Sequence, residues 1–293
     1  GGTWSPGRIR LSAKQIRYLL GIILLLVTAG ILALDAWLDR RITGSAILVV
    51  LGLVGYLEYS KMATGRVLGL QSLGGFLATA WFLGLACWDW GSKPFELSAE
   101  EQELMILGVF ALVLLSFLAA LFSKEYLERA GRVAQTVLGA ILFGLFFSFV
   151  IRIYCRSEHV LTGAVFVFGV KLTDIGGYVI GSTIGRTKFL KVSPNKTLEG
   201  FAAGFLLVGV WFGVIANSGC VSDLKFGWIG GIAFGIILAF SAAIGDLSES
   251  LMERLYGVKD SGSLLPEFGG VLDMIDSFIF SGFAFWCLLH FWS

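Results

Sequence analysis

The chain has 293 residues, of which 56% are hydrophobic and only 15% are charged. A soluble chain usually carries about 25% charged residues, and here the charges lie between long uncharged stretches. The net charge of +1 is far from the basic excess of a nucleic-acid-binding surface. These values exclude a soluble enzyme, a disordered chain and a nucleic-acid-binding protein, and they predict a polytopic membrane protein.

Nine apolar stretches are candidates for membrane spans, since about 20 apolar residues cross a bilayer. The sequence has neither the alternation of a β-barrel nor a fixed-period repeat, so we expect these spans to be helices. The second stretch is short enough to be tilted or partly re-entrant. The predicted fold is an all-α polytopic membrane protein with about nine transmembrane helices. The stretches are 18–34, 44–59, 67–88, 104–122, 133–153, 160–185, 200–216, 226–244 and 277–291.

The basic residues predict how these spans are oriented. With the N-terminus in the cytoplasm, the inner segments hold 15 of the Lys and Arg side chains and the outer segments hold 6. Because cytoplasmic loops are enriched in Lys and Arg, we expect a cytoplasmic N-terminus and an external C-terminus. Tryptophan favours membrane interfaces, and five tryptophans fall at the expected outer interface: Trp37, Trp88, Trp90, Trp228 and Trp292. The predicted location is a bacterial inner membrane, with an organelle membrane as the alternative.

The spans divide the chain into three predicted parts. Residues 1–17 form a cytoplasmic segment, residues 18–153 a scaffold of five spans, and residues 154–293 a catalytic region of four spans. Two cytoplasmic loops of the catalytic region, 186–199 and 245–276, are rich in the polar residues that catalysis needs. We therefore expect an active site that faces the cytoplasm.

Three aspartates in the second loop predict a metal site. Asp246 lies at the cytoplasmic end of the eighth span, while Asp273 and Asp276 lie at the start of the ninth and share one face of a helix because they are three residues apart. Like charges crowded near hydrocarbon are costly unless a cation neutralises them. Carboxylate oxygens suit Mg²⁺ or Mn²⁺. Any one aspartate is better explained as a helix cap, but three around a Gly-Gly turn favour the metal.

The first loop supplies cations for phosphate groups. Its Gly, Ser, Thr and Asn residues surround four basic side chains, which can bind either a polyphosphate or lipid head groups. The Walker pattern is absent. Asp174, an acid inside an apolar span, favours a functional site, and Lys171 is its expected partner. Cations and metal-binding acids on the same side of the membrane suit phosphoryl or nucleotidyl transfer. The basic side chains are Arg186, Lys188, Lys191 and Lys196.

A long pattern in the C-terminal third of the chain resembles the phosphatidate cytidylyltransferase family, also called CDP-diacylglycerol synthases. Shorter companion motifs start at Asp174, Ser193 and Gly245. The resemblance implies a membrane enzyme that condenses CTP with phosphatidate, giving CDP-diacylglycerol and pyrophosphate. It implies Mg²⁺ as cofactor, with the identity of any second cation left open. The long pattern comprises Ser250, Arg254, Lys259, Asp260, Ser261, Ser263, Leu265, Pro266, Gly269, Gly270, Asp273 and Asp276.

The same resemblance implies roles for individual residues. Asp246, Asp273 and Asp276 are expected to bind the metal, and Lys259 and Asp260 to act at the nucleotide phosphates together with Asp246 and Asp273. The expected partners are CTP, phosphatidate and membrane lipid, with no nucleic acid and with a homodimer left open. The residues expected to bind substrate are Asp174, Lys196, Glu199, Asn195, Ser193 and Lys171.

Three positions depart from the family pattern. Phe268 stands where the family usually has His, Met274 where it has Arg, and Glu253 where it has Lys. Each change removes an actual or potential positive charge near the expected phosphate site. We expect weaker phosphate contacts with the aspartates untouched.

Two alternative functions use the same features. An ion-coupled transporter would use intramembrane acids such as Asp174, but it predicts inverted repeats, which the sequence lacks. A related lipid-active enzyme, such as a polyprenol kinase, would share the apolar scaffold and the metal-binding acids without the whole pattern from Ser250 to Asp276. A lipid product that depends on CTP would separate these functions.

Overall fold

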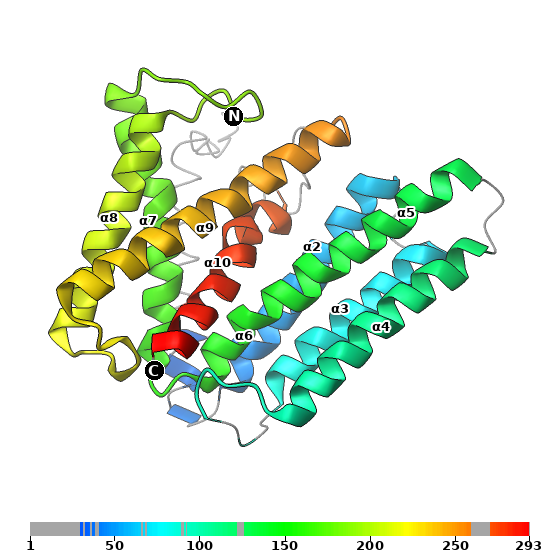
Figure 1. The fold of residues 1–293 in the computed structure, drawn as a ribbon, viewed down its shortest axis with the longest axis horizontal. Helices are drawn as coiled ribbons and strands as arrows, with labels where there is room; N and C mark the ends of the chain where they lie inside the picture. The colour runs from blue at the N-terminus through cyan, green and yellow to red at the C-terminus, as the bar shows by residue number, and fades with distance from the viewer. Residues whose placement is uncertain are drawn as a thin grey trace, which may run out of the picture.

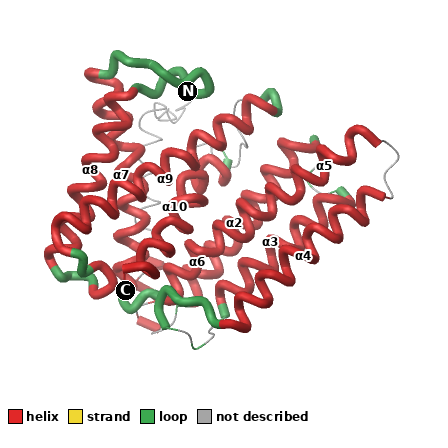
Figure 2. Tube along the Cα trace, viewed as in Figure 1, coloured by secondary structure: helices red, strands yellow, loops and turns green. Residues whose placement is uncertain are grey.

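A computed structural model of the chain describes residues 30–31, 33–35, 37–38, 41–65, 67, 69–88, 91, 93–121, 126–258 and 270–292. These residues form helices joined by loops, with no strand among them (Figures 1 and 2). One isolated antiparallel bridge pairs Lys188 with Thr197. The predicted all-α class is therefore confirmed over the described part of the chain.

The first half of the described chain is a bundle of long apolar helices, seen on the right of Figure 1. Its last long helix contains a π-helical stretch in the middle and so continues from the end of one α-helix to the start of the next. The elements are α2 (Ile42–Thr64), α3 (Leu70–Cys87), α4 (Ala99–Leu121), α5 (Tyr126–Gly139), the π-helix η1 (Ala140–Phe146) and α6 (Phe147–Arg156). We refer to this bundle as the scaffold, and the predicted division of the chain into three parts stays a prediction.

The second half places two helix pairs beside that bundle. α7 and α8 pack as a hairpin, α9 crosses α8 obliquely, and α10 lies between α9 and the helices α2 and α6 of the scaffold (Figure 1). The loop between α7 and α8, residues 185–197, lies at one end of the molecule, and the C-terminus lies at the other (Figure 1). The elements are α7 (Val160–Ile184), α8 (Leu198–Ser218), the 3-10 turn η2 (Ser222–Leu224), α9 (Gly227–Leu255) and α10 (Val271–Trp292).

Seven helices in the described chain are long and apolar enough to cross a membrane, and α3 adds a shorter apolar helix. The predicted second span is a continuous helix of 23 residues, Ile42–Thr64, so it is not re-entrant. The predicted first span, 18–34, lies largely outside the described residues. The structure therefore supports a polytopic membrane protein, and the count of nine stays a prediction.

The ends of α9 and α10 correct the predicted loop 245–276. α9 continues to Leu255 instead of ending at Ile244, and α10 begins at Val271 instead of Ser277. The fall in hydropathy at the first carboxylate, Asp246, predicts the end of the helix too early. The helical spacing of the buried residues continues beyond it. Gly245, Glu249 and Met252 continue the buried stripe of α9 at helical spacing. The expected loop acids therefore lie on two helices, where backbone geometry fixes their positions.

Three of the four described tryptophans of the predicted outer interface lie at one end of the molecule. Trp88 follows α3, Trp228 begins α9 and Trp292 ends α10, all at the end opposite the α7–α8 loop. All three side chains are exposed, as is that of Trp37, the fourth described tryptophan of the set. Trp90 lies outside the described residues.

Candidate active site

Five carboxylates gather where α9 and α10 lie side by side. Asp246, Glu249 and Glu253 come from α9, and Asp273 and Asp276 come from α10. Their oxygen atoms form two groups of three, Asp246–Glu249–Asp276 and Glu249–Glu253–Asp273, each with ligand atoms within 4.8 Å of one another. The structure thus brings together the three predicted metal ligands and adds two glutamates, with Glu249 shared by both groups.

The innermost acids of this carboxylate cluster are the most deeply buried. Glu249 is 7% exposed and Asp276 is 4% exposed. The backbone N–H and the hydroxyl of Ser277 both donate to Asp276 Oδ1, but Glu249 Oε1 has no hydrogen-bond partner among the described residues. A buried acceptor without a donor is costly. A divalent cation would satisfy it, and the all-oxygen donor set fits Mg²⁺.

Gly245 allows the two acidic helices to approach this closely. A Cβ atom added at Gly245 would overlap the carbonyl oxygen of Asp276 and would lie 3.1 Å from the Cα atom of Ser277. Backbone atoms cannot rotate away as a side chain can, so any larger residue must push α9 from α10. The absence of a side chain at Gly245 is therefore what sets Asp246 opposite Asp276.

We expect Gly245→Ala to lower both stability and activity. Forced overpacking costs about 1–3 kcal/mol, and the displacement separates the carboxylates of α9 from those of α10. Thermal unfolding and the Mg²⁺ concentration at half-maximal rate measure the two effects. Gly84→Ala is the matched control, because a Cβ at Gly84 meets no atom within 4 Å. Equal behaviour of the two variants would contradict the close-approach role of Gly245.

Lys196 reaches the carboxylate cluster from the α7–α8 loop. Its Nζ forms an ion pair with Asp246 Oδ2 and lies 5.9 Å from the centroid of the Phe201 ring. Burial lowers the pKa of the Lys196 ammonium, while the charges of Asp276, Asp174 and Glu249 oppose that shift. The Lys196 ammonium is thus held beside the acids by electrostatic attraction from several carboxylates.

Lys171 and Asp174 form a second charged pair on α7, as predicted. Lys171 Nζ lies 3.3 Å from Asp174 Oδ2, and the two side chains are 39% and 41% exposed. The Lys171 ammonium also lies 4.9 Å from the centroid of the Phe278 ring of α10, two residues beyond Asp276. α7 therefore contributes one more cation to the neighbourhood of the carboxylate cluster.

Glu199 shapes the α7–α8 loop from the start of α8. Its carboxylate accepts the backbone N–H groups of Arg186 and Thr187 at 3.1–3.2 Å and the Thr187 hydroxyl at 2.8 Å. Ser193 and Asn195 belong to the turn before Lys196, in which Lys196 N donates to Ser193 O at 3.1 Å. Of the loop residues predicted to bind substrate, Lys196 is thus the one placed at the acids.

Several predicted residues need separate comment. Lys259, Asp260 and Phe268 lie outside the described residues. Met274 is partly buried and packs against the hydrophobic core, whereas Glu253 is a member of the second group of acids. A carboxylate at position 253 thus adds a possible metal ligand as well as removing a positive charge.

Two residues near the cluster, Glu249 and Glu58, were not among the predicted site residues. Glu249 was visible as an acid three residues after Asp246, the same spacing that marked Asp273 and Asp276. Glu58 lies within α2, and its Oε2 accepts the N–H of Leu272 in α10 at 2.8 Å. An acid inside a predicted span is the signal that would have found it, as it found Asp174.

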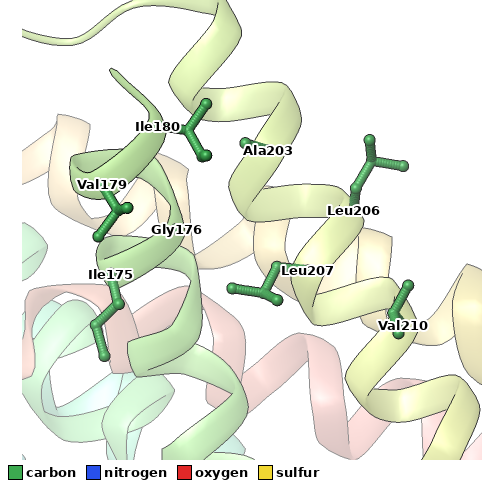
Figure 3. Close-up of a pocket in the computed structure, with 8 residues that line it drawn as sticks. All are labelled: Ile175, Gly176, Val179, Ile180, Ala203, Leu206, Leu207 and Val210. Carbon is green, nitrogen blue, oxygen red and sulfur yellow. The ribbon is translucent and has the colours of Figure 1, made fainter. Parts of the chain in front are cut away.

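A cavity of about 450 Å³ lies apart from these charges, between α7 and α8 (Figure 3). Its lining is formed only by apolar side chains and a glycine, among them Ile175, Leu207 and Val210. It offers no hydrogen-bonding side chain to a phosphate. The carboxylate cluster with Lys196 and Lys171 therefore remains the candidate active site.

Comparison with known proteins identifies the family to which the chain belongs. The sequence matches the cytidylyltransferase family over residues 15–292. A phosphatidate cytidylyltransferase of Helicobacter pylori is 31% identical over 268 residues, covering 86% of this chain and 92% of the relative. One of Bacillus subtilis is 31% identical over 260 residues, covering 87% and 93%. One of Mycobacterium bovis is 36% identical over 161 residues, covering 54% and 50%. The match spans both halves of the fold, and the chain belongs to the cytidylyltransferase family.

Proposed function

We propose that this protein transfers the cytidylyl group of CTP to phosphatidate, forming CDP-diacylglycerol and releasing pyrophosphate. The observation that carries the proposal is the carboxylate cluster of α9 and α10 with Lys196 and Lys171 beside it, in a chain that belongs to the cytidylyltransferase family. The relatives that match most of the chain are named phosphatidate cytidylyltransferases. Their activity is therefore the first to test.

The proposed cofactor is Mg²⁺. Asp246, Glu249 and Asp276 would hold it, with Glu253 and Asp273 available for a second cation. The fit rests on the donor set, which consists of carboxylate oxygens and includes the orphaned acceptor Glu249 Oε1. When bound, Mg²⁺ would neutralise charge on the CTP phosphates and so favour departure of pyrophosphate.

The side chains of the protein would mainly bind and orient. A phosphate oxygen of phosphatidate forms the new bond to the α-phosphorus of CTP, and the bond from that phosphorus to the pyrophosphate oxygen breaks. The lipid phosphate is already an anion, so no general base is needed. Lys196 and Lys171 would hold phosphate oxygens by charge-assisted hydrogen bonds. The hydrogen bond from the Thr187 hydroxyl to Glu199 would fix the α7–α8 loop and so keep Lys196 in place.

The direct test is incorporation of radiolabelled CTP into lipid by the purified protein, with phosphatidate and Mg²⁺ present. We expect a labelled lipid that requires all three components, together with release of one pyrophosphate per product. A kinase would instead transfer the terminal phosphate and release CDP. A transporter would give no CTP-dependent lipid, and either result would overturn the proposal.

We further propose that the α7–α8 loop faces the cytoplasm, because soluble CTP and the bilayer lipid must meet at that interface. In a variant whose native cysteines are replaced, Lys188→Cys should react with an impermeant thiol reagent from the cytoplasmic side only. A cysteine added after Ser293 should react from the opposite side only. Labelling of both positions from one side would contradict the proposed topology.

A further inference from the structure

We infer that Glu58 is a positioning residue of the active site, which uses a hydrogen bond from the scaffold to fix the first turn of α10. This inference rests on the proposed function for its activity readout. It goes beyond the proposed ligands, because Glu58 belongs to α2 and lies outside both groups of acids that can bind a cation. The structure assigns it an action through another residue, Leu272.

The hydrogen bond joins two distant parts of the chain. Glu58 Oε2 accepts the backbone N–H of Leu272 at 2.8 Å, across 214 positions in the sequence. Leu272 is the second residue of α10 and immediately precedes Asp273. The first N–H groups of a helix lack partners within the helix. Glu58 therefore holds the helix at the residue next to a carboxylate of the cluster.

A second carboxylate, that of Asp273, caps the same end of α10. Asp273 Oδ2 accepts the N–H of Gly270 at 3.0 Å, so Asp273 both caps the helix and belongs to the cluster. If the first turn of α10 moves, the Asp273 carboxylate must move with it. The contact between Glu58 and Leu272 thus controls where Asp273 lies relative to Glu249 and Glu253.

The neighbours of Glu58 along α2 brace the same region. A Cβ at Gly55 would lie 2.7 Å from the Cδ1 atom of Ile275 in α10, so the two helices nearly touch there. The hydroxyl of Tyr59 lies 3.5 Å from that of Tyr256, just after α9, and donates to the carbonyl of Gln135 at 3.1 Å. One segment of α2 therefore contacts the helix that bears Asp273 and also the end of the helix that bears Glu249.

Substitutions distinguish a role of Glu58 as a hydrogen-bond acceptor from a direct role of its negative charge. Glu58→Gln keeps the length of the side chain and an acceptor oxygen but removes the charge. Glu58→Asp keeps the charge but shortens the side chain by one methylene. If Glu58 positions α10 by its reach, the Gln variant should stay close to wild type, while the Asp and Ala variants should be impaired.

The experiment measures metal binding and turnover separately in the purified full-length protein. Direct Mn²⁺ binding, followed by the electron paramagnetic resonance signal of the free ion, should weaken about tenfold in Glu58→Asp and Glu58→Ala and less than threefold in Glu58→Gln. The kcat for CTP-dependent lipid synthesis should fall in the same order, with a smaller change in KM for CTP. These changes should be accompanied by a higher Mg²⁺ requirement.

Asp35→Ala provides the matched control. Asp35 also caps a helix with its carboxylate, accepting the N–H groups of Thr43 and Gly44 at 3.0 and 2.8 Å, but at the other end of α2. A purely structural effect would lower thermal stability in this variant and in Glu58→Ala alike, without weakening Mn²⁺ binding in either. We expect clearly weaker Mn²⁺ binding only in Glu58→Asp and Glu58→Ala.

The possible outcomes separate the two proposals. Normal Mn²⁺ binding in both Glu58→Asp and Glu58→Ala overturns the positioning role, as does a Gln variant that is impaired while the Asp variant is normal. If Glu58→Ala does not fold, the Asp and Gln variants still decide. If the wild-type protein makes no CTP-dependent lipid, the proposed function fails, and the Mn²⁺ measurement tests the positioning role on its own.

Discussion

Asp273→Asn is expected to reduce CTP-dependent lipid synthesis at least about a thousandfold, equivalent to about 4 kcal/mol, while the protein still folds. The carboxylate of Asp273 lies within 4.8 Å of the ligand atoms of Glu249 and Glu253. Asparagine is nearly isosteric and keeps an oxygen that can accept the N–H of Gly270, so the helix cap survives. What is lost is one negative charge that would hold a cation. The same loss is expected for Asp246→Asn.

Initial rates across a Mg²⁺ titration, made on monodisperse protein, check this expectation. Asp223→Asn is a suitable control, because Asp223 lies in η2 at the far end of the molecule and accepts a hydrogen bond from Thr162. That variant should keep near-wild-type rates. Near-wild-type activity of Asp273→Asn at every Mg²⁺ concentration would remove Asp273 from the list of essential ligands.

Residues that lie close together in the chain could be placed relative to one another from the sequence alone. Asp273 and Asp276 are three residues apart, so helical geometry alone places them on one face. The ion pair of Lys171 with Asp174 has the same spacing, and the structure confirms it. Local periodicity of this kind needs no knowledge of the rest of the fold.

Contacts between distant segments could not be predicted in this way. Nothing in the sequence pairs Glu58 with Leu272, because the hydrogen bond depends on how α2 packs against α10. The C-terminal end of α9 was missed for a different reason. Hydropathy treats Asp246 as the end of a span, although the buried stripe continues through Glu249. The acids are buried by helix crossing at Gly245, and a hydropathy scale contains no term for that.

The largest stability effect is expected at the opposite end of the molecule, in a buried cluster of charges between α4 and α6. Glu101 and Arg152 are both fully buried, with Arg152 Nη2 2.9 Å from Glu101 Oε1. Arg156 Nη1 lies 2.9 Å from Glu101 Oε2, so a single carboxylate forms ion pairs with two guanidinium groups. Removing one partner of a buried ion pair typically costs about 3–5 kcal/mol, because the remaining charge is left without compensation.

The geometry of this charge cluster predicts which variants lose the most stability. Glu101→Gln removes the carboxylate that pairs with the fully buried Arg152 and the partly buried Arg156, and it should destabilise most, by about 3–5 kcal/mol or slightly more. Arg152→Met should cost less, because Glu101 keeps Arg156 as a partner and methionine fills part of the vacated space. Glu100→Gln, a change at the adjacent exposed residue, is the matched control and should stay within about 0.5 kcal/mol of wild type.

Unfolding of the purified protein in detergent, titrated with denaturant, measures these differences. Because Glu101 lies far from the carboxylate cluster, the fraction of Glu101→Gln that remains folded should keep its kcat and its Mg²⁺ requirement. This pattern is the reverse of the one expected for Asp273→Asn, which should lose turnover and keep stability. If Arg152→Met destabilised the protein more than Glu101→Gln, the shared carboxylate would not be the centre of the charge cluster, and the arginine would have to stabilise the scaffold through its contacts with Ser148 and Met105.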